Sequence, residues 1–217
     1  SLIMPGASFT GAGVTFNVTN AYINVPSSYC STKPSEASGI FDFNITNSIW
    51  ESAGKLAFEE ATVNAKVDFA LLNSVLVTGS HLVFGTASGE EGVVIDNSNV
   101  NVGTSRQIEN CGTMTVKNGS VVNGAVATSS NAKNPGTLIV DNATYAVTGE
   151  FSGSDLGTGT IVYKNGATIS AGSITKANIQ IDATGMKAGE NVNITANLAN
   201  LTGTIEVINN NMPGAKI

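Results

Sequence analysis

A short unit recurs through almost the whole chain and limits what it can fold into. Four copies align without gaps: GTMTVKNGS, GTLIVDNAT, GTIVYKNGA and GTIEVINNN. Earlier copies keep the final Asn, which we call the anchor, but place the glycine less regularly. A period of 20 to 50 residues is typical of solenoids, propellers and arrays. The anchors, 18 to 27 residues apart, are Asn20, Asn47, Asn73, Asn97, Asn118, Asn142, Asn165 and Asn209, with Ala183 in the same slot.

Two columns of apolar residues precede the anchors in every copy. Alternation with period two predicts a strand whose apolar residues face inward while the residue between them faces outward. The first three copies carry Phe in one column and later copies carry aliphatic residues, so the core should change in width along its axis. Two before the anchor are Val18, Ile45, Leu71, Ile95, Val116, Val140, Tyr163, Ile181 and Val207; four before are Phe16, Phe43, Phe69, Val93, Met114, Leu138, Ile161, Ile179 and Ile205.

A third inner column is expected three residues after the anchor. Its members are Ile23, Trp50, Leu76, Val100, Val121, Tyr145 and Thr168. We therefore interpret Trp50 as a core residue rather than a platform for sugar binding. The anchor Asn should end each strand, because Asn tolerates the left-handed backbone region and its side chain bonds locally or to stacked neighbours. The preceding Gly should serve a turn for the same conformational reason.

Composition agrees with a β-solenoid and excludes several other classes. Asn (25), Gly (24) and Thr (23) make up a third of the 217 residues, and all three are poor helix formers. Charged residues are only 12% beside 41% apolar residues, which argues against disorder. A net charge of −6 with a single Arg argues against nucleic-acid binding. No apolar run is long enough for a membrane-spanning helix, so we expect no membrane insertion.

These units resemble right-handed parallel β-helix proteins, in particular the repetitive passenger regions of bacterial autotransporter-type adhesins. The resemblance rests on the Gly-Thr-apolar-x-apolar-[Asp/Lys]-Asn-[Gly/Ala] unit and covers nearly all of the chain. It implies an all-β solenoid, which the anchors divide into eight to nine coils within a single domain, 1–217. We expect this domain to belong to a longer surface or secreted protein, or to pack its ends on another copy.

Few residues could carry out chemistry. The only His is His81, and a single His in the sequence does not indicate a catalytic triad. His81, Cys30 and Cys111 lack the paired short spacing of a zinc site. Glu59-Glu60 and Glu90-Glu91 are interpreted as solvated loop charges. No catalytic residue, metal ligand or cofactor site is predicted.

Asp96 and Asp141 are the one pair of carboxylates to weigh as a catalytic site. They lie two coils apart in the expected register, about 9.6 Å along the axis, near the upper limit for inverting glycoside hydrolases. Lys117 occupies the coil between them and would keep both ionised, whereas a proton donor needs the opposite. A lyase of the pectate type would need Arg near its substrate, and Arg106 is the only Arg.

The position just before the anchor suggests a structural role for the same carboxylates. On five successive coils it reads Asp96, Lys117, Asp141, Lys164 and Asp182, so the sign of the charge alternates at every step. If the register is right, these side chains stack about 4.8 Å apart and attract their neighbours. A slip by one coil would replace attraction with repulsion.

The two cysteines should not pair. Cys30 and Cys111 lie about three coils, or roughly 14 Å, apart, beyond the 7 Å limit between Cα atoms of a disulfide. A long loop at 26–39 is the one feature that could bring them together. We predict free thiols.

The favoured function is a non-enzymatic extracellular β-helix, a bacterial surface stalk or adhesin-like protein. Its partner would be a host or cell-surface glycan or protein. One alternative is a polysaccharide hydrolase or lyase with this fold. Another is a filament subunit that associates end to end.

Overall fold

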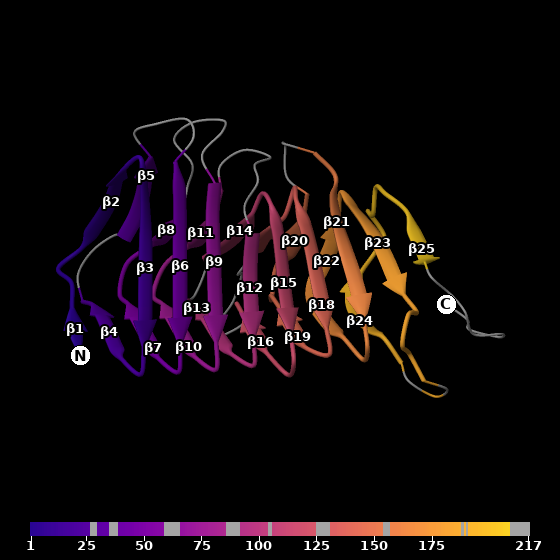
Figure 1. The fold of residues 1–217 in the computed structure, drawn as a ribbon. Coiled ribbons are helices and arrows are strands. Elements are labelled where there is room, and N and C mark those ends of the chain that lie inside the picture. The colour runs from indigo at the N-terminus through magenta and orange to yellow at the C-terminus, as the bar shows by residue number, and fades with distance from the viewer. Residues whose placement is uncertain are drawn as a thin grey trace.

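The chain folds into an all-β parallel solenoid. The computed structural model describes residues 1–26, 30–34, 39–58, 66–85, 92–103, 106–124, 131–153, 157–187, 189 and 191–208. Every regular element in these residues is a strand, every strand pairing is parallel, and the strands stack in register from β1 at one end to β25 at the other (Figure 1). No helix in the described part is long and apolar enough to cross a membrane.

The strands form three faces around a common core. The first face is the nine-stranded sheet of β3 (Gly13–Thr19), β6 (Ile40–Thr46), β9 (Lys66–Leu72), β12 (Gly92–Asp96), β15 (Thr113–Lys117), β18 (Thr137–Asp141), β21 (Gly159–Lys164), β23 (Ala177–Asp182) and β25 (Ile205–Ile208). It is the row of arrows nearest the viewer in Figure 1.

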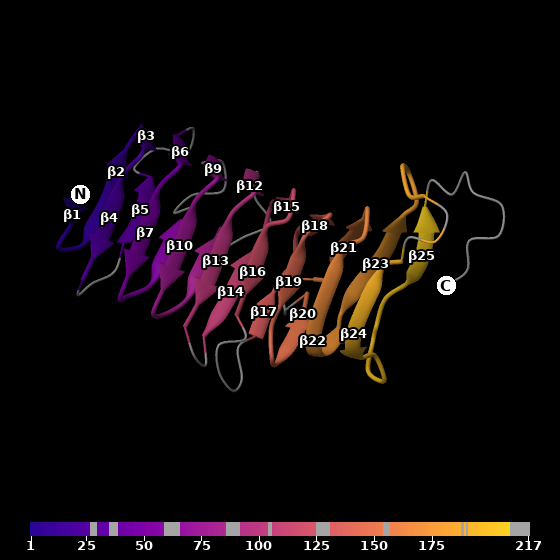
Figure 2. The ribbon, with the colours of Figure 1, turned by 90° about the horizontal axis from the view of Figure 1, so that it is seen from below.

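The second and third faces belong to one sixteen-stranded sheet, joined through β22 (Thr168–Thr175). The second face, seen in Figure 2, contains β1 (Leu2–Ile3), β4 (Tyr22–Val25), β7 (Ile49–Ser52), β10 (Val75–Thr78), β13 (Asn99–Val102), β16 (Val121–Asn123), β19 (Thr144–Ala146), the start of β22, and β24 (Asn193–Asn197). The third contains β2 (Ala7–Gly11), β5 (Cys30–Pro34), β8 (Leu56–Phe58), β11 (Leu82–Phe84), β14 (Gln107–Asn110), β17 (Asn131–Lys133), β20 (Glu150–Ser152) and the end of β22.

The solenoid has about seven turns, fewer than the eight to nine coils expected from the anchors. After β23, the described residues supply strands of the second and first faces, β24 and β25, and none of the third. The spacing of only 18 residues between Asn165 and Ala183 also has a cause. Within that interval β22 continues as one strand from the second face to the third, with an irregularity between Ser170 and Ser173, and pairs with β19 and then with β20.

The anchor asparagines form the corners between the first and second faces. All seven described ones have a left-handed backbone, with φ between 45° and 55°, as the sequence predicted; they are Asn20, Asn47, Asn73, Asn97, Asn118, Asn142 and Asn165. Ala183 takes its place in register but does not adopt this conformation. Asn209 lies outside the described residues. The anchors therefore set where each strand of the first face ends.

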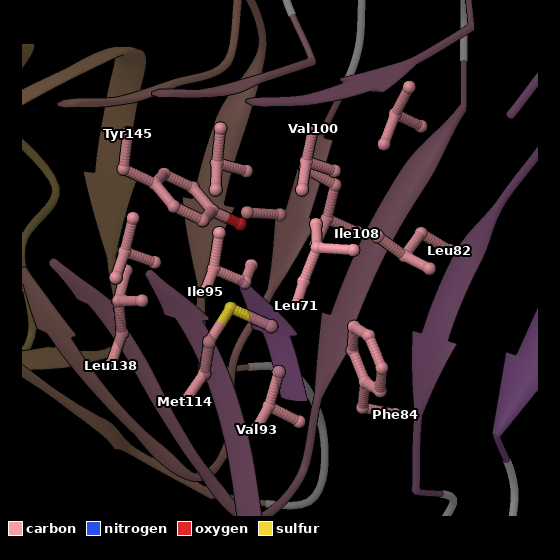
Figure 3. Packing of buried hydrophobic residues seen from close by; sticks show 14 of the residues in the cluster. Leu71, Leu82, Phe84, Val93, Ile95, Val100, Ile108, Met114, Leu138 and Tyr145 are labelled. Carbon is pink, nitrogen blue, oxygen red and sulfur yellow. The ribbon is translucent and has the colours of Figure 1, made fainter. Parts of the chain in front are cut away.

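The two predicted inner columns are confirmed in register along the first face, although Ile205, at the end of one column, is exposed. Phe16 pairs with Phe43 and Phe43 with Phe69, and the columns continue to Ile205 and Val207. Most of these residues are buried in one continuous cluster, and Figure 3 shows Leu71, Ile95 and Met114 within it. The core also changes as expected along the axis. Ring contacts link seven aromatic residues in the first coils: Phe9, Phe16, Phe43, Trp50, Phe58, Phe69 and Phe84.

The third inner column differs from the prediction at two positions. Trp50 is fully buried and pairs with Ile23 and Leu76, as expected. Val122 and Ile169 continue the column, however, instead of Val121 and Thr168. At these two corners an Asn-Gly pair forms the turn, and the extra glycine shifts every following residue by one position. A one-residue shift in a strand moves each side chain to the opposite face.

The glycine that opens each unit has a different role from the one expected. Of these glycines, Gly136 and Gly159 have no left-handed backbone, and only Gly203 has a positive φ. A Cβ at Gly136 would overlap the Gly112 carbonyl oxygen, and one at Gly159 would overlap that of Asn134. These glycines are needed for close approach of neighbouring coils.

Asn142 offers a test of the corner conformation, because its φ is 47° and its side chain has no hydrogen bond among the described residues. We expect Asn142→Ala to lower the free energy of unfolding by about 1 kcal/mol, since Ala pays the left-handed penalty. Asn142→Gly is the matched control and should change it by less than about 0.5 kcal/mol, because glycine tolerates this conformation. Denaturant unfolding measures both. Equal losses in the two variants would contradict the assigned role.

Candidate functional site

The predicted charge ladder lies along the end of the first-face strands, with its first four members partly exposed and Asp182 buried. The strand registers pair Asp96 with Lys117, Lys117 with Asp141, Asp141 with Lys164, and Lys164 with Asp182. All five residues therefore lie on successive rungs in one column, as predicted. We call this column the charge ladder.

Ion pairs and amide contacts hold the ladder together. The Lys117 Nζ lies 3.2 Å from Asp96 Oδ2, and the Lys164 Nζ lies 3.1 Å from Asp182 Oδ2. Asp141 accepts a hydrogen bond of 2.7 Å from the Asn165 Nδ2, and Asp96 accepts one of 2.6 Å from the Asn118 Nδ2. Each lysine thus pairs closely with one neighbour, and anchor amides supply the other contacts.

Asp96 and Asp141 both contact hydrogen-bond donors of neighbouring coils. They lie two rungs apart with Lys117 between them in register, as the sequence indicated. Among the described residues, Asp96 contacts the Lys117 ammonium and the Asn118 amide, and Asp141 accepts a hydrogen bond from the Asn165 amide. Carboxylate oxygens that accept such bonds are suited to holding the coils in register, whereas a general acid must present a proton to its substrate.

Beside the ladder, the middle outer column of the first face is weakly polar over five rungs. Its members are Ala70, Val94, Thr115, Ile139 and Val162, paired in register from β9 to β21. Val94 is 36% exposed, and Leu72, one position before an anchor, is 39% exposed. We call the five residues the outer strip. Together with the ladder, they form a surface on which side chains repeat from rung to rung.

The other candidate residues are dispersed. His81 precedes β11, and its Nδ1 accepts a hydrogen bond of 3.1 Å from the Gln107 backbone N–H on the next coil. Cys30 lies in β5, and the Cys111 thiol, which follows β14, donates to the Gly85 carbonyl oxygen. The described residues contain no group of His, Cys, Asp and Glu arranged to hold a metal ion. Arg106 is exposed, and Glu59-Glu60 and Glu90-Glu91 lie outside the described residues.

The cysteines are not joined by a disulfide, in agreement with the prediction. The third face pairs β5 with β8, β8 with β11, and β11 with β14, so three rungs separate the coil of Cys30 from that of Cys111. Both thiols are buried. Burial raises the pKa of the Cys30 thiol to about 12.

Two buried rings carry polar atoms that have no hydrogen-bond partner among the described residues. They are the Trp50 Nε1 and the Tyr163 hydroxyl. Burial raises the pKa of Tyr163, and that of Tyr145, because the charged phenolate would lose its solvation. Both Trp50 and Tyr163 therefore belong to the core, as the inner columns predicted, and neither is available as a surface platform for sugars.

A ladder of buried serines was missed by the sequence analysis. The hydroxyl oxygen of each accepts a hydrogen bond of 3.0 Å from a backbone N–H of the preceding coil, and the hydroxyl donates to a carbonyl of its own corner. The sequence signal is Ser after the anchor in three copies, and after Asn-Gly in the fourth. The members are Ser48, Ser74, Ser98 and Ser120.

Comparison of the chain with protein-family models, curated proteins and solved structures finds no match.

Reversing the central charge of the ladder should destabilise the fold in a salt-dependent way. Lys117→Glu would place three carboxylates on adjacent rungs, with an expected loss of roughly 1 kcal/mol at low salt because these side chains are partly exposed. Lys117→Gln is the control for removing the charge alone and should cost less. Urea unfolding at several salt concentrations measures both. A loss for Lys117→Glu that does not shrink as salt rises would contradict the ladder.

Removing one serine of the buried ladder should cost more than removing a surface serine. Ser74→Ala leaves the buried Ser48 N–H without its acceptor, so we expect a loss of about 1–3 kcal/mol. Ser8→Ala, on the exposed surface of β2, is the control and should stay within about 0.5 kcal/mol. Thermal or denaturant unfolding would show the difference. Similar losses in the two variants would be evidence against the serine ladder.

The buried thiols predict a difference in reactivity between the folded and unfolded chain. At mildly alkaline pH, Cys30 stays protonated in the fold, because its pKa is raised from 9.0 to about 12. Stability should therefore fall as pH rises above about 9, where the unfolded chain releases this proton first. A thiol titration should find two reactive groups in the unreduced, unfolded monomer and slow labelling in the native protein. Zero thiols after unfolding would contradict the assignment.

Proposed function

We propose that this chain is a non-enzymatic extracellular β-solenoid, serving as a surface stalk or adhesin-like binding protein on a bacterium, like the autotransporter passenger regions that its repeats resemble. The main support for the proposal is that polar side chains at the surface contact the neighbouring coil. The ladder carboxylates, the anchor amides and His81 all contact a neighbouring coil.

Continuity of the core also supports a stalk. One cluster of buried apolar residues extends from Ile23 to Ile179, and both sheets run past it without a break. Such a solid stack suits a protein that projects a surface over a distance, because each coil is braced by its two neighbours.

The first face is the surface that we assign to a partner. The outer strip offers small apolar and threonine side chains at a regular spacing, and the ladder beside it offers alternating charges. Weakly charged, partly apolar surfaces of this kind suit contact with a glycan or a protein of a host or neighbouring cell. Location at the cell surface or outside the cell is part of this proposal.

A polysaccharide panel tests the proposal against its alternative of a hydrolase or lyase. Hydrolysis and β-elimination should both be undetectable with the wild-type chain. Turnover that disappears in Asp96→Asn or Asp141→Asn would overturn the proposal and make these carboxylates catalytic.

A binding screen tests the surface itself. We expect a glycan or protein ligand found on an array to lose affinity for Thr115→Arg, which places a large charge in the outer strip. Ala146→Arg, at an outward position of β19 on the second face, is the matched control and should bind normally. An equal loss of affinity in the two variants would show that the ligand does not bind to the first face.

A further inference from the structure

Two corners of the solenoid have nearly the same sequence and backbone but different contacts. Lys117-Asn118-Gly119-Ser120 and Lys164-Asn165-Gly166-Ala167 both place Asn and Gly in the left-handed region, with φ of 55° and 77° at the first corner and 46° and 75° at the second. In both, the N–H of the fourth residue donates to the lysine carbonyl. In both, the Asn side chain donates to an aspartate of the ladder. The two corners are therefore a matched pair.

They differ in how the next coil holds them. The Asn118 N–H donates to the Asp141 carbonyl at 3.2 Å, and the Gly119 N–H donates to the Asn142 carbonyl at 2.7 Å. At the second corner, neither the Asn165 N–H nor the Gly166 N–H has a hydrogen-bond partner among the described residues. On the side that faces the next coil, the Asn165 and Gly166 backbone N–H groups of this corner are therefore not fixed by hydrogen bonds from the described residues.

The cause lies in the missing anchor of the following coil. Ala183 occupies the anchor slot without the left-handed backbone of an anchor, as expected for a residue that pays a steric penalty there. The Asp182 carboxylate instead accepts a hydrogen bond of 3.0 Å from the Thr184 N–H. This corner therefore does not repeat the shape of the one below it.

From this contrast we propose that Asn165 is the preferred site of spontaneous deamidation in the folded chain. The Gly166 backbone nitrogen attacks the Asn165 Cγ, its proton passes to solvent, and the side-chain nitrogen leaves as ammonia. Water then opens the resulting succinimide at either carbonyl to give aspartate or isoaspartate. The attacking nitrogen must leave its place in the turn, and only at Gly166 does this motion break no hydrogen bond to the next coil. Gly124, in the third Asn-Gly pair, is held by the Ala146 carbonyl at 2.8 Å.

The reaction would alter the end of the charge ladder. The Asn165 amide donates to Asp141, and a carboxylate in its place would put like charges in contact. Isoaspartate also adds a backbone atom to the corner and would disturb its stacking. Deamidation at Asn165 should therefore loosen the coils that follow it.

Peptide mapping by mass spectrometry of the intact chain, aged at mildly alkaline pH, tests the proposal. In the folded protein, aspartate and isoaspartate should accumulate at Asn165 roughly two- to ten-fold faster than at Asn118, corresponding to the hydrogen bond that Gly119 must lose. In denaturant the two sites should react at similar rates, because their local sequences nearly match. Exposure alone predicts the reverse order in the fold, since Asn118 is exposed and Asn165 is half-buried. An Asn118 rate equal to or above that of Asn165 in the folded chain would overturn the proposal.

Amide hydrogen exchange provides a second readout that does not require the reaction. The Gly166 amide should exchange faster than the Gly119 amide in the native protein. Equal protection at the two glycines would show that the next coil holds both corners, which would also overturn the proposal.

Discussion

The hydrogen bonds between successive corners are the interaction on which the rest of the structure depends. At each of six corners, the anchor N–H donates to the carbonyl of the residue before the next anchor, at 3.0 to 3.3 Å; the donors are Asn20, Asn47, Asn73, Asn97, Asn118 and Asn142. The bond requires a left-handed residue at the same place in every coil, because only then do the corners superpose. Asn supplies that conformation at low cost. Once the corners are aligned, the strands between them are in register and the inner columns meet.

The register in turn explains how polar groups of the solenoid find partners although few of them are charged. Many polar groups find a partner one rung away: serine hydroxyls accept backbone N–H groups in the buried corner, and the ladder pairs lysine with aspartate outside. Stacked amides do the same, since the Asn97 Nδ2 donates to Asn73 at 2.8 Å and the Asn110 Nδ2 donates to Asn134 at 2.7 Å. A slip by one coil would break many of these contacts together. Each contact is weak alone, but all of them stabilise the same register.

Much of this arrangement could be predicted from the sequence because its signals are periodic. The apolar columns, the anchors, the charge ladder and the separation of the cysteines all follow from counting residues between recurring asparagines. The displaced members of the third column, Val122 and Ile169, could not be found by that count, since a glycine after Asn adds one residue to the corner. The continuous β22 depends on how the chain crosses a corner, which local composition does not encode. The Asn165 and Gly166 N–H groups, which have no partner among the described residues, reflect the Ala183 that occupies the next anchor slot.

The candidate site was less predictable than the fold for a related reason. Sequence spacing placed Asp96 and Asp141 at a separation that suits a hydrolase, and only their contacts favour a structural role. The period-two alternation placed the outer strip on the outward side of the strands, and strand pairing shows that its members form one column. A repeat in the sequence indicates which residues lie in the same column. What such a column can do chemically depends on the contacts of each side chain, which the repeat does not give.

Cross-linking across one rung is the most direct measurement of the register. Val94 and Thr115 are in-register partners on the outer strip, so cysteines introduced at both would have Cα atoms about 4.8 Å apart, within the range of a disulfide. Cysteines at Val94 and Thr113 would be about 8 Å apart and out of reach. The account predicts rapid oxidation of the first pair and little of the second, mapped by peptide mass spectrometry. Equal closure of the two pairs, or closure of the second alone, would contradict in-register stacking and with it the ladder and the corners.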